Sequence, residues 1–345
     1  MGALSTEQVL AEEAEAIHDT SKPDSAPNFR RDTHPTGNAC VKANITVNPY
    51  LPPRLNVGFL AGKPDGGRVY KSWIRFANAA DTPTSDRRRD FRSMSIKLFG
   101  VSGERNALPH DEGTTQDLLF NGHDTFFAGD PRQFLDYFSA CVKGGGCNPM
   151  KNPFVAWDLI THPRGAYNLW QGRKVYPTIQ DISWSSVAPF ALGDSQVKYA
   201  ATPCGPQAQY GGPGDTSFYL RQRLQARLDP RNNNHVCLDL QVQLRNDPPS
   251  QPIENTLVAW DGNVTGWQKV ARIDIYPQNF SSSAQQDFCE RLTFNPYQGL
   301  KAHAPLGGIN RARGVTMQAL QDVRLKANGW KRFAPGELTG DETFN

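Results

Sequence analysis

Short stretches with the alternation of a β-strand recur along this chain, and each is closed by glycine, proline or asparagine. They cover residues 40–47, 72–79, 92–101, 117–122, 196–203, 235–245 and 270–278. The sequence also contains 30 Gly and 26 Pro, which is typical of short strands joined by turns rather than of a helical bundle. These features predict an α+β fold in which one antiparallel sheet curls into a barrel with helices around it.

Helical segments are fewer and stand between groups of strands. A polar N-terminal arm over residues 1–28 carries one short helix at 6–17, and further helices are predicted at 131–142, 282–294 and 309–324. Pro131 occupies the first turn of its helix, where proline is favoured. The predicted organisation is therefore the arm, one main domain over 29–330, and a short C-terminal tail over 331–345.

The last predicted helix has an unusual face. Arg313, Met317, Leu320 and Arg324 are spaced by four, three and four residues, so they share one stripe of the helix. A solvated face does not need the methionine, and a core face does not need the two arginines. The stripe predicts a flat partner that is apolar in the middle and anionic at its edge.

Two other stretches carry polar side chains suited to chemistry. His34 lies in the turn 29–38, close to Arg31 and next to Thr33, whose hydroxyl could bond the imidazole ring. It is either a satisfied surface histidine or an acid–base group. Arg75 interrupts an apolar strand, so it needs an anion, supplied either by an aspartate or by a ligand carboxylate.

A third stretch combines an amide with aromatic rings. Asn121 ends a predicted strand and is followed by Phe126, Phe127 and Phe134. Taken alone, this is a turn before a core cluster. Taken with the two arginine-rich stretches, it indicates an apolar pocket with one amide donor.

Composition and charge exclude some partners and leave others open. The chain has 37 basic and 34 acidic residues, a net charge of +3, and its basic residues are scattered. This balance predicts neither a nucleic-acid partner nor attraction to a membrane surface. No apolar run approaches the length of a transmembrane helix, so no integral membrane segment is expected.

The six cysteines form no motif. Their spacings match neither a CxxC pair nor a zinc site. The N-terminal segment is acidic and lacks the apolar core of a secretory signal. We therefore expect a cytoplasmic protein with reduced, buried thiols rather than disulfides.

Seven segments, in the same order along the chain, resemble the heme-dependent catalase superfamily, and in particular its short catalase-like peroxidase and allene oxide synthase-like branch. They are RDTHPTGN, WIRFANA, RRDFRSMSIKL, DLLFNGHDTFF, DISWSSVAPFALGDSQVKY, FCERLTFNP and PLGGINRAR. The resemblance runs from about residue 27 to 330. It implies a catalase-type antiparallel β-barrel with a long N-terminal arm, heme b as cofactor, and hydrogen peroxide or an organic hydroperoxide as substrate.

The resemblance also implies roles for individual residues. The family's distal histidine and asparagine are matched by His34 and Asn121. Its aromatic residues beside the heme are matched by Phe126 and Phe134. Its arginines around the heme propionates and on the helix beneath the iron are matched by Arg31, Arg75, Arg313 and Arg324.

One position departs from the family in a way that affects the chemistry. Met317 stands where the family has its proximal tyrosine, and the alternative iron ligands are His303 or water. A neutral thioether favours ferrous iron and raises the reduction potential, whereas an anionic phenolate stabilises ferric iron. The family's usual turnover should therefore be weakened. Two functions stay open: a peroxidase-like or hydroperoxide-rearranging enzyme, and a heme-binding or sensing protein with little turnover.

The sequence also differs from the catalase superfamily in smaller ways. Thr33 replaces the valine of true catalases and resembles the allene oxide synthase branch, which rearranges fatty-acid hydroperoxides. Ser93 stands where relatives usually have glycine. The chain ends soon after the proximal helix, so no NADPH is expected, and by analogy the long arm suits a homo-oligomer.

Overall fold

The computed structural model describes residues 31, 34–62, 67–80, 84–205 and 212–344. The predicted arm, its helix at 6–17 and Thr33 lie outside these residues. No helix in the described part of the chain is both long and apolar enough to cross a membrane.

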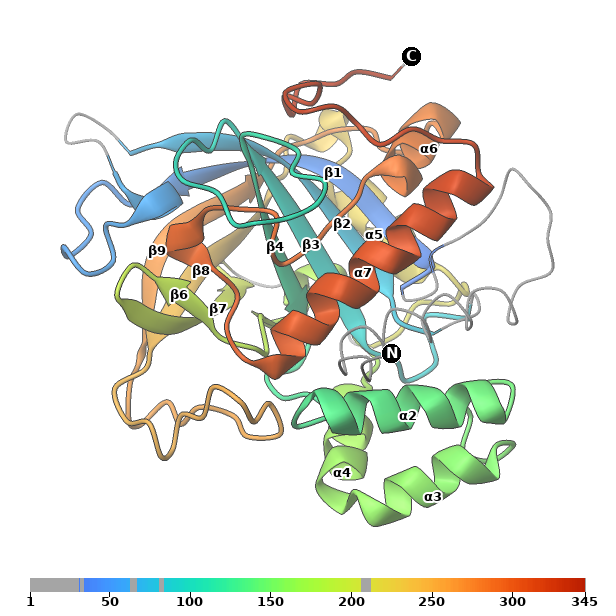
Figure 1. Ribbon diagram of the computed structural model, residues 1–345. Helices are drawn as coiled ribbons and strands as arrows, with labels where there is room; N and C mark the ends of the chain where they lie inside the picture. Colours follow the sequence, from blue (N-terminus) through green and yellow to red (C-terminus); the bar gives the residue numbers. More distant parts are fainter. Residues whose placement is uncertain (1–30, 32–33, 63–66, 81–83, 206–211, 345) are drawn as a thin grey trace.

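Nine strands form one antiparallel sheet in the order β5-β4-β3-β2-β1-β9-β8-β7-β6. Strand β5 pairs with both β4 and β7, so eight strands close into a barrel and β6 extends β7 as a hairpin. The predicted antiparallel barrel is confirmed (Figure 1). The strands are β1 (Thr36–Val47), β2 (Val69–Asn78), β3 (Arg92–Phe99), β4 (Thr115–Asn121), β5 (Trp184–Ser185), β6 (Phe190–Leu192), β7 (Ser195–Pro203), β8 (Val236–Leu244) and β9 (Trp267–Ile275).

The described residues contain six α-helices and four short 3-10 turns. The helices are α2 (Pro131–Lys143), α3 (Pro153–Thr161), α4 (Pro163–Gly172), α5 (Tyr219–Arg227), α6 (Ser283–Arg291) and α7 (Gly308–Ala327). The turns are η1 (Gly58–Leu60), η2 (Ile179–Asp181), η3 (Pro230–Asn232) and η4 (Lys301–His303). The predicted helices at 131–142, 282–294 and 309–324 are confirmed as α2, α6 and α7, whereas α3, α4 and α5 were not predicted.

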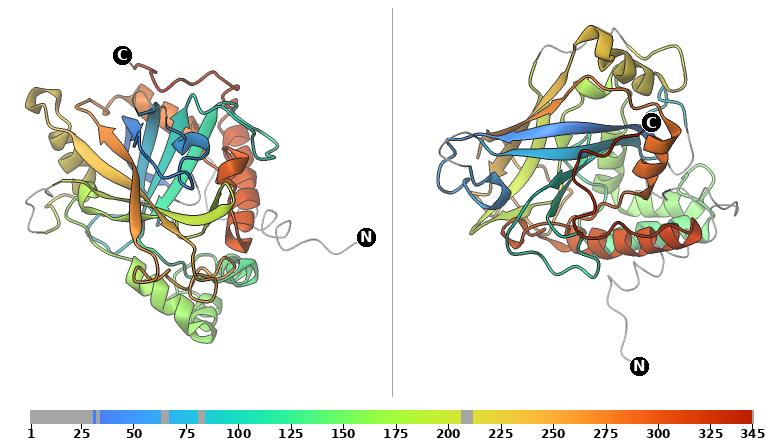
Figure 2. Two further views of the ribbon diagram at one scale, coloured as in Figure 1. Left: turned by 90° about the vertical axis from the view of Figure 1, so that its left-hand side faces the viewer. Right: turned by 90° about the horizontal axis from the view of Figure 1, so that it is seen from above.

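The two faces of the sheet carry different residues because side chains alternate along a strand. On β3, Met94, Ile96 and Leu98 point into the apolar core that fills the barrel. The alternate positions Ser93 and Ser95 face outward instead. Helix α7 runs across this outer face in front of β2, β3 and β4 (Figures 1 and 2). The space between the strands and α7 holds the candidate site.

Three disulfides correct the expectation of reduced thiols. They join Cys40 to Cys289, Cys141 to Cys147 and Cys204 to Cys237, with Cα–Cα distances of 6.2, 4.6 and 5.6 Å. No cysteine is left free. The expectation was wrong because two of these pairs are distant in sequence and meet only through the fold of the barrel and its helices. The cytoplasmic location, inferred partly from reduced thiols, stays a prediction.

Candidate functional site

A cavity lies between the outer face of the barrel and helix α7. Its empty space measures about 670 Å³, a volume that includes the part open to solvent. The helix contributes all four residues of the predicted stripe together with Gln321. The strands and neighbouring loops supply the opposite wall, which consists of Arg31, His34, Arg75, Ser93, Ser95, Leu119, Phe120, Asn121 and Phe294. The stripe of α7 therefore faces His34 and Asn121 across one cavity.

Helix α7 is fixed close to its neighbours by contacts of its backbone. At its start, the Gly308 amide donates a hydrogen bond to the Glu254 carboxylate at 2.7 Å. Farther along, a Cβ atom on Gly314 would lie 2.7 Å from the Tyr297 ring, so glycine permits this close approach. The Asn295 side chain also donates to the Gly314 carbonyl at 2.8 Å. These contacts fix the position from which the arginine and methionine side chains extend into the cavity.

His34 has the environment of a neutral imidazole. Its Nδ1 atom is shielded from solvent and has no described hydrogen-bond partner. Burial, followed by the positive charges of Arg75, Arg313 and Arg31, lowers its pKa to about 3. Its backbone has φ of +58°, a left-handed conformation that is uncommon outside glycine, and its carbonyl accepts a hydrogen bond from Arg75 Nη2 at 2.9 Å. The ring is therefore neutral at neutral pH, with a lone pair on one of its nitrogens.

Asn121 lies at the end of β4, where it is paired in register with Ser93 on β3. Both side chains line the cavity. No described residue hydrogen-bonds the Asn121 carboxamide. Its amide is therefore available to a ligand in the cavity, on the same wall as His34.

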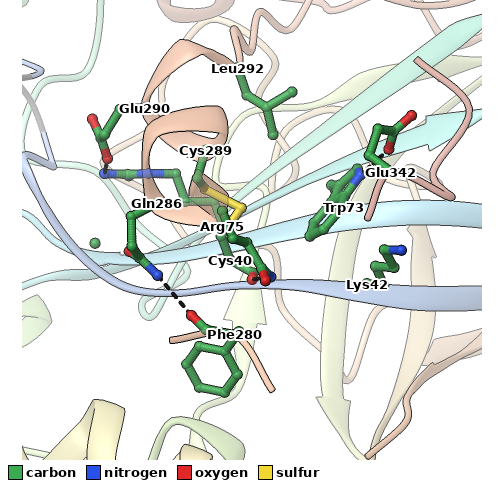
Figure 3. The surroundings of a disulfide bond; sticks show 12 residues. Cys40, Lys42, Trp73, Arg75, Phe280, Gln286, Cys289, Glu290, Leu292 and Glu342 are labelled. Atoms are coloured by element: carbon green, nitrogen blue, oxygen red, sulfur yellow. Dashed lines mark hydrogen bonds and ion pairs between the residues drawn. A yellow bond between two sulfur atoms is a disulfide. The ribbon is translucent and has the colours of Figure 1, made fainter. Parts of the chain in front are cut away.

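A cluster of arginines surrounds one carboxylate at the edge of the cavity. Glu290, at the end of α6, lies 3.2 Å from Arg75 Nη2 and 3.5 Å from Arg31 Nε. Arg31 also donates to the Leu292 carbonyl at 2.6 Å, and Arg324 donates to the Glu290 and Leu292 carbonyls. Burial alone would raise the pKa of Glu290, but the charges of Arg75, Arg31 and Arg324 outweigh it and lower this pKa. Figure 3 shows the Arg75–Glu290 pair next to the Cys40–Cys289 disulfide.

Positive charge in the cavity exceeds negative charge. Arg313 forms no ion pair with a described residue, and its Nη1 donates to Asn310 Oδ1 at 3.1 Å. Burial lowers its pKa to about 10. Four arginines therefore line a site whose acidic partner is Glu290. The Nε atoms of Arg31 and Arg75 are also buried without a hydrogen-bond partner. Such a site suits an anionic ligand, because unpaired buried charge is costly.

The rest of the cavity is apolar. Leu119, Phe120 and Phe294 lie on the strand side, and Met317 and Leu320 lie on the α7 side. A ligand with an apolar body and anionic edge groups, such as heme with its two propionates, fits this distribution. On the α7 wall, Met317 carries a thioether sulfur, one of the atoms that bind heme iron in proteins, and His34 lies on the opposite wall.

His303, the alternative ligand from the sequence, is placed elsewhere. Its side chain extends from the η4 turn and is fully buried. Its Nδ1 lies 2.7 Å from the Tyr199 hydroxyl, and its Nε2 accepts from the Phe59 amide at 3.1 Å. Both ring nitrogens are therefore engaged, and His303 does not line the cavity. This leaves Met317 or water as candidate ligands on the α7 side.

Two of the predicted aromatic residues are separate from this lining. Phe126 and Phe134 pack together, with ring centroids 5.7 Å apart, in a cluster that includes Ile309 and Ala312 of α7. They adjoin the helix rather than the cavity surface. Their contact with a bound heme stays a prediction, as does the role of Thr33, which lies outside the described residues.

Sequence reasoning missed Glu290, the carboxylate that pairs with Arg31 and Arg75. A signal for it was present: the residue lies in a predicted helix and in one of the recognised segments, directly after Cys289. It also missed the buried ion pairs of Lys97 with Asp117 and Glu112, at 2.8 and 2.6 Å. These pairs tie β3 to β4 and to the loop before β4, on the same face of the sheet as Ser93 and Ser95.

Comparisons with known proteins agree with the architecture. No protein-family model matches the sequence, and no curated protein matches it. Among solved structures, catalase A from Saccharomyces cerevisiae matches with a TM-score of 0.64 and 16% identity, over 100% of this chain and 70% of the catalase. A fungal catalase matches with a TM-score of 0.61 and 15% identity, over 100% of this chain and 68% of the catalase.

A bacterial catalase also matches, with a TM-score of 0.60 and 15% identity. That match covers 91% of this chain and 60% of the bacterial protein. At this level of identity the similarity establishes architecture, and the predicted fold class is confirmed. The chain has a catalase-type fold, an antiparallel barrel with helices around it.

Proposed function

We propose that the cavity between the barrel and α7 binds heme b and that the protein is a heme-dependent enzyme acting on hydrogen peroxide or an organic hydroperoxide. One observation carries the proposal. A neutral, shielded imidazole and a free carboxamide lie on one wall of a cavity whose other wall carries two arginines and a methionine. The catalase-type fold supports the same assignment.

Each group of lining residues has a part in holding the cofactor. Arg31, Arg75 and Arg324 would bind the propionates, because their guanidinium groups surround one edge of the cavity around Glu290. The apolar side chains would cover the faces of the macrocycle. Met317, with Arg313 one helical turn before it on α7, would offer its thioether sulfur to the iron.

Bound heme supplies an iron centre at which the O–O bond of a peroxide is activated. The chain supplies proton transfer and orientation. His34 is neutral at physiological pH, so it can take a proton from the peroxide and return it to the departing oxygen. Asn121 can donate a hydrogen bond from its carboxamide to the peroxide and so orient it.

Because of Met317, we assign this protein a different reaction from that of a typical catalase. A neutral thioether does not stabilise ferric iron as a phenolate does, so we infer a peroxidase-like or hydroperoxide-rearranging activity rather than rapid dismutation. The resemblance of the Thr33 segment to the allene oxide synthase branch supports a fatty-acid hydroperoxide as substrate. A heme-binding or sensing protein with little turnover is the second candidate, and it is favoured by the same methionine.

The first test is a hemin titration of the purified protein followed by absorption spectroscopy. A Soret band that saturates at one heme per chain supports the site. Consumption of hydrogen peroxide and of a fatty-acid hydroperoxide is then measured for the loaded protein, for His34→Gln and for the exposed control His235→Gln. We expect His34→Gln to retain heme and to lose about 100-fold or more in turnover, and the control to match the parent.

The outcomes separate the two candidates. Heme binding with no turnover of either peroxide contradicts the enzyme and supports the sensing protein. The absence of a Soret band after hemin addition rejects the cofactor and both functions with it.

A further inference from the structure

Helices α3 and α4 expose an apolar face that no described part of the chain covers. On α3, the exposed side chains include Phe154, Trp157 and Ile160, spaced by three residues, and Trp157 and Ile160 are 68% and 70% exposed. On α4, Tyr167 and Trp170 are exposed with the same spacing, and their rings lie 6.4 Å apart. Large aromatic residues gathered on one exposed face are unusual for a soluble domain and mark an interaction surface.

The opposite side of these helices is anchored to the body of the protein. Asn168 is buried and donates to the Phe126 and Leu257 carbonyls at 2.8 and 3.1 Å. At Gly165, an added Cβ would lie 2.2 Å from the Phe127 carbonyl oxygen, so α4 has no room to move closer. The two helices form the outermost layer at one end of the barrel, beyond α2 (Figures 1 and 2). Their exposed face is therefore held outward.

Basic residues surround the exposed face. Lys151 precedes α3, Arg164 lies in the first turn of α4, and Arg173 and Lys174 follow α4; all four are exposed. Two arginines also contact the rings directly. The Arg164 guanidinium lies 5.7 Å from the Tyr167 ring centroid, and that of Arg89 lies 5.0 Å from the Trp170 ring.

Acidic residues are nearly missing from the same segment. Between Met150 and Lys174, Asp158 is the one acidic side chain. It is 10% exposed and lies 3.2 Å from His162 Nδ1, so it faces away from the solvent. Within this segment, the exposed tryptophan, tyrosine and aliphatic side chains are thus accompanied by basic residues and by no exposed carboxylate.

We propose that this exposed face of α3 and α4 is a peripheral membrane-binding surface whose partner is an anionic lipid bilayer. Tryptophan and tyrosine are favoured at the boundary between lipid headgroups and acyl chains. Basic residues next to an inserted apolar face are attracted to anionic headgroups. The surface was identified from its own side chains, and it does not depend on heme or on a peroxide substrate.

Charge distinguishes a bilayer from a second copy of the chain. In a symmetric dimer through this face, the basic residues of both copies would approach one another. The segment offers no exposed carboxylate to neutralise them. An anionic bilayer covers the same apolar side chains and supplies the negative charge, so the observations favour lipid.

The test is co-sedimentation of the full chain with vesicles of phosphatidylcholine alone and of equal parts phosphatidylcholine and phosphatidylserine. We expect the parent protein to bind the mixed vesicles and to bind neutral vesicles much more weakly. Trp157→Glu should lower partitioning into mixed vesicles by about tenfold or more, because it places a charge where an aromatic ring would insert. Lys151→Gln and Arg164→Gln should each lower it by roughly fivefold.

A matched control is Tyr50→Glu, which replaces an exposed aromatic residue on the loop after β1 and should leave vesicle binding unchanged. Circular dichroism verifies that each variant is folded. Failure of the parent protein to bind mixed vesicles overturns the proposal, and so does equal binding to neutral vesicles. Sedimentation velocity gives the other contrary outcome: an oligomer that Trp157→Glu converts to monomers, with no vesicle binding, would make this face a subunit interface.

Discussion

Met317 is the lining residue at which the cavity departs from the family resemblance. It extends from the middle of α7 into the cavity, one turn beyond Arg313, where the family resemblance places a tyrosine. If it binds iron, replacing its thioether with a phenolate should favour the ferric state. We predict that Met317→Tyr shifts the spectrum of the hemin-loaded protein and raises peroxide turnover by about tenfold, equivalent to about 1.4 kcal/mol of activation free energy.

The matched variant for this prediction is Met317→Leu, which keeps the size and removes the sulfur. Its spectrum should lose any thioether ligation without gaining that of a phenolate. Absorption spectra in the ferric and ferrous states and initial rates with hydrogen peroxide measure both effects. Unchanged spectra in both variants would show that water, not Met317, lies beneath the iron.

His34 gives a prediction about acid stability. Its pKa is lowered to about 3 in the folded protein, against an ordinary value near 6.5, so the unfolded chain binds the extra proton between these limits. Stability is therefore lost as pH falls below about 6.5, with a slope of up to ~1.4 kcal/mol per pH unit from this group. His303, with a pKa also lowered to about 3 by burial, contributes in the same direction.

Urea unfolding of the protein without hemin between pH 4 and 7 measures this slope. In His34→Gln, one titrating group is gone, and the slope should fall by up to ~1.4 kcal/mol per pH unit, most fully near pH 5. His235→Gln, at an exposed site, serves as the control and should keep the parent slope. An unchanged slope in His34→Gln would mean that the folded protein admits protons to this imidazole at ordinary pH.

At the scale of elements, the Cys40–Cys289 disulfide connects β1 to α6 and thereby positions the Glu290 carboxylate beside Arg75. It closes a chain segment of 249 residues, whereas Cys141–Cys147 closes one of 6 residues next to α2. We predict that the double variant Cys40→Ser, Cys289→Ser loses about 2–4 kcal/mol of unfolding free energy and binds hemin more weakly, because Glu290 and Arg75 are no longer held together.

The variant Cys141→Ser, Cys147→Ser is the matched control for this disulfide. It lies away from the cavity and should bind hemin as the parent does. Urea unfolding and hemin titration of both double variants make the comparison. Equal hemin affinity in the two would show that α6 keeps its position without the bond.

The elements also show where sequence prediction succeeds and where it stops. The long strands and α7 were predictable because alternation and helical spacing mark which face of an element is buried. The residues of the α7 stripe also predicted that one face of this helix lines a ligand site. Helices α3 and α4 were missed because they are short and rich in aromatic residues that form helices poorly. Glu290 and the disulfides depend on contacts between distant segments, and local patterns do not encode such contacts.

At the scale of the whole molecule, the arginines around the cavity carry more positive charge than the other described residues neutralise. Four arginines line the cavity with Glu290 as their acidic partner, and within the described part of the chain Arg313 is paired with an amide oxygen. Maintaining this arrangement costs stability, because the charges repel one another and are partly desolvated. An anionic ligand relieves that cost, so ligand binding and folding stability are coupled.

We predict that hemin at about 100 times its dissociation constant raises the free energy of unfolding by about 2.7 kcal/mol, and that Arg313→Gln reduces this gain. Without hemin, Arg313→Gln should be as stable as the parent or more so, because it removes a partly buried charge that no described carboxylate neutralises. Lys326→Gln, at an exposed position in the last turn of the same helix, should change neither the stability without hemin nor the gain. Thermal unfolding with and without hemin measures all three proteins. A large loss of stability in Arg313→Gln without hemin would show that this arginine stabilises the fold itself. The excess of positive charge in the cavity would then not indicate an anionic ligand.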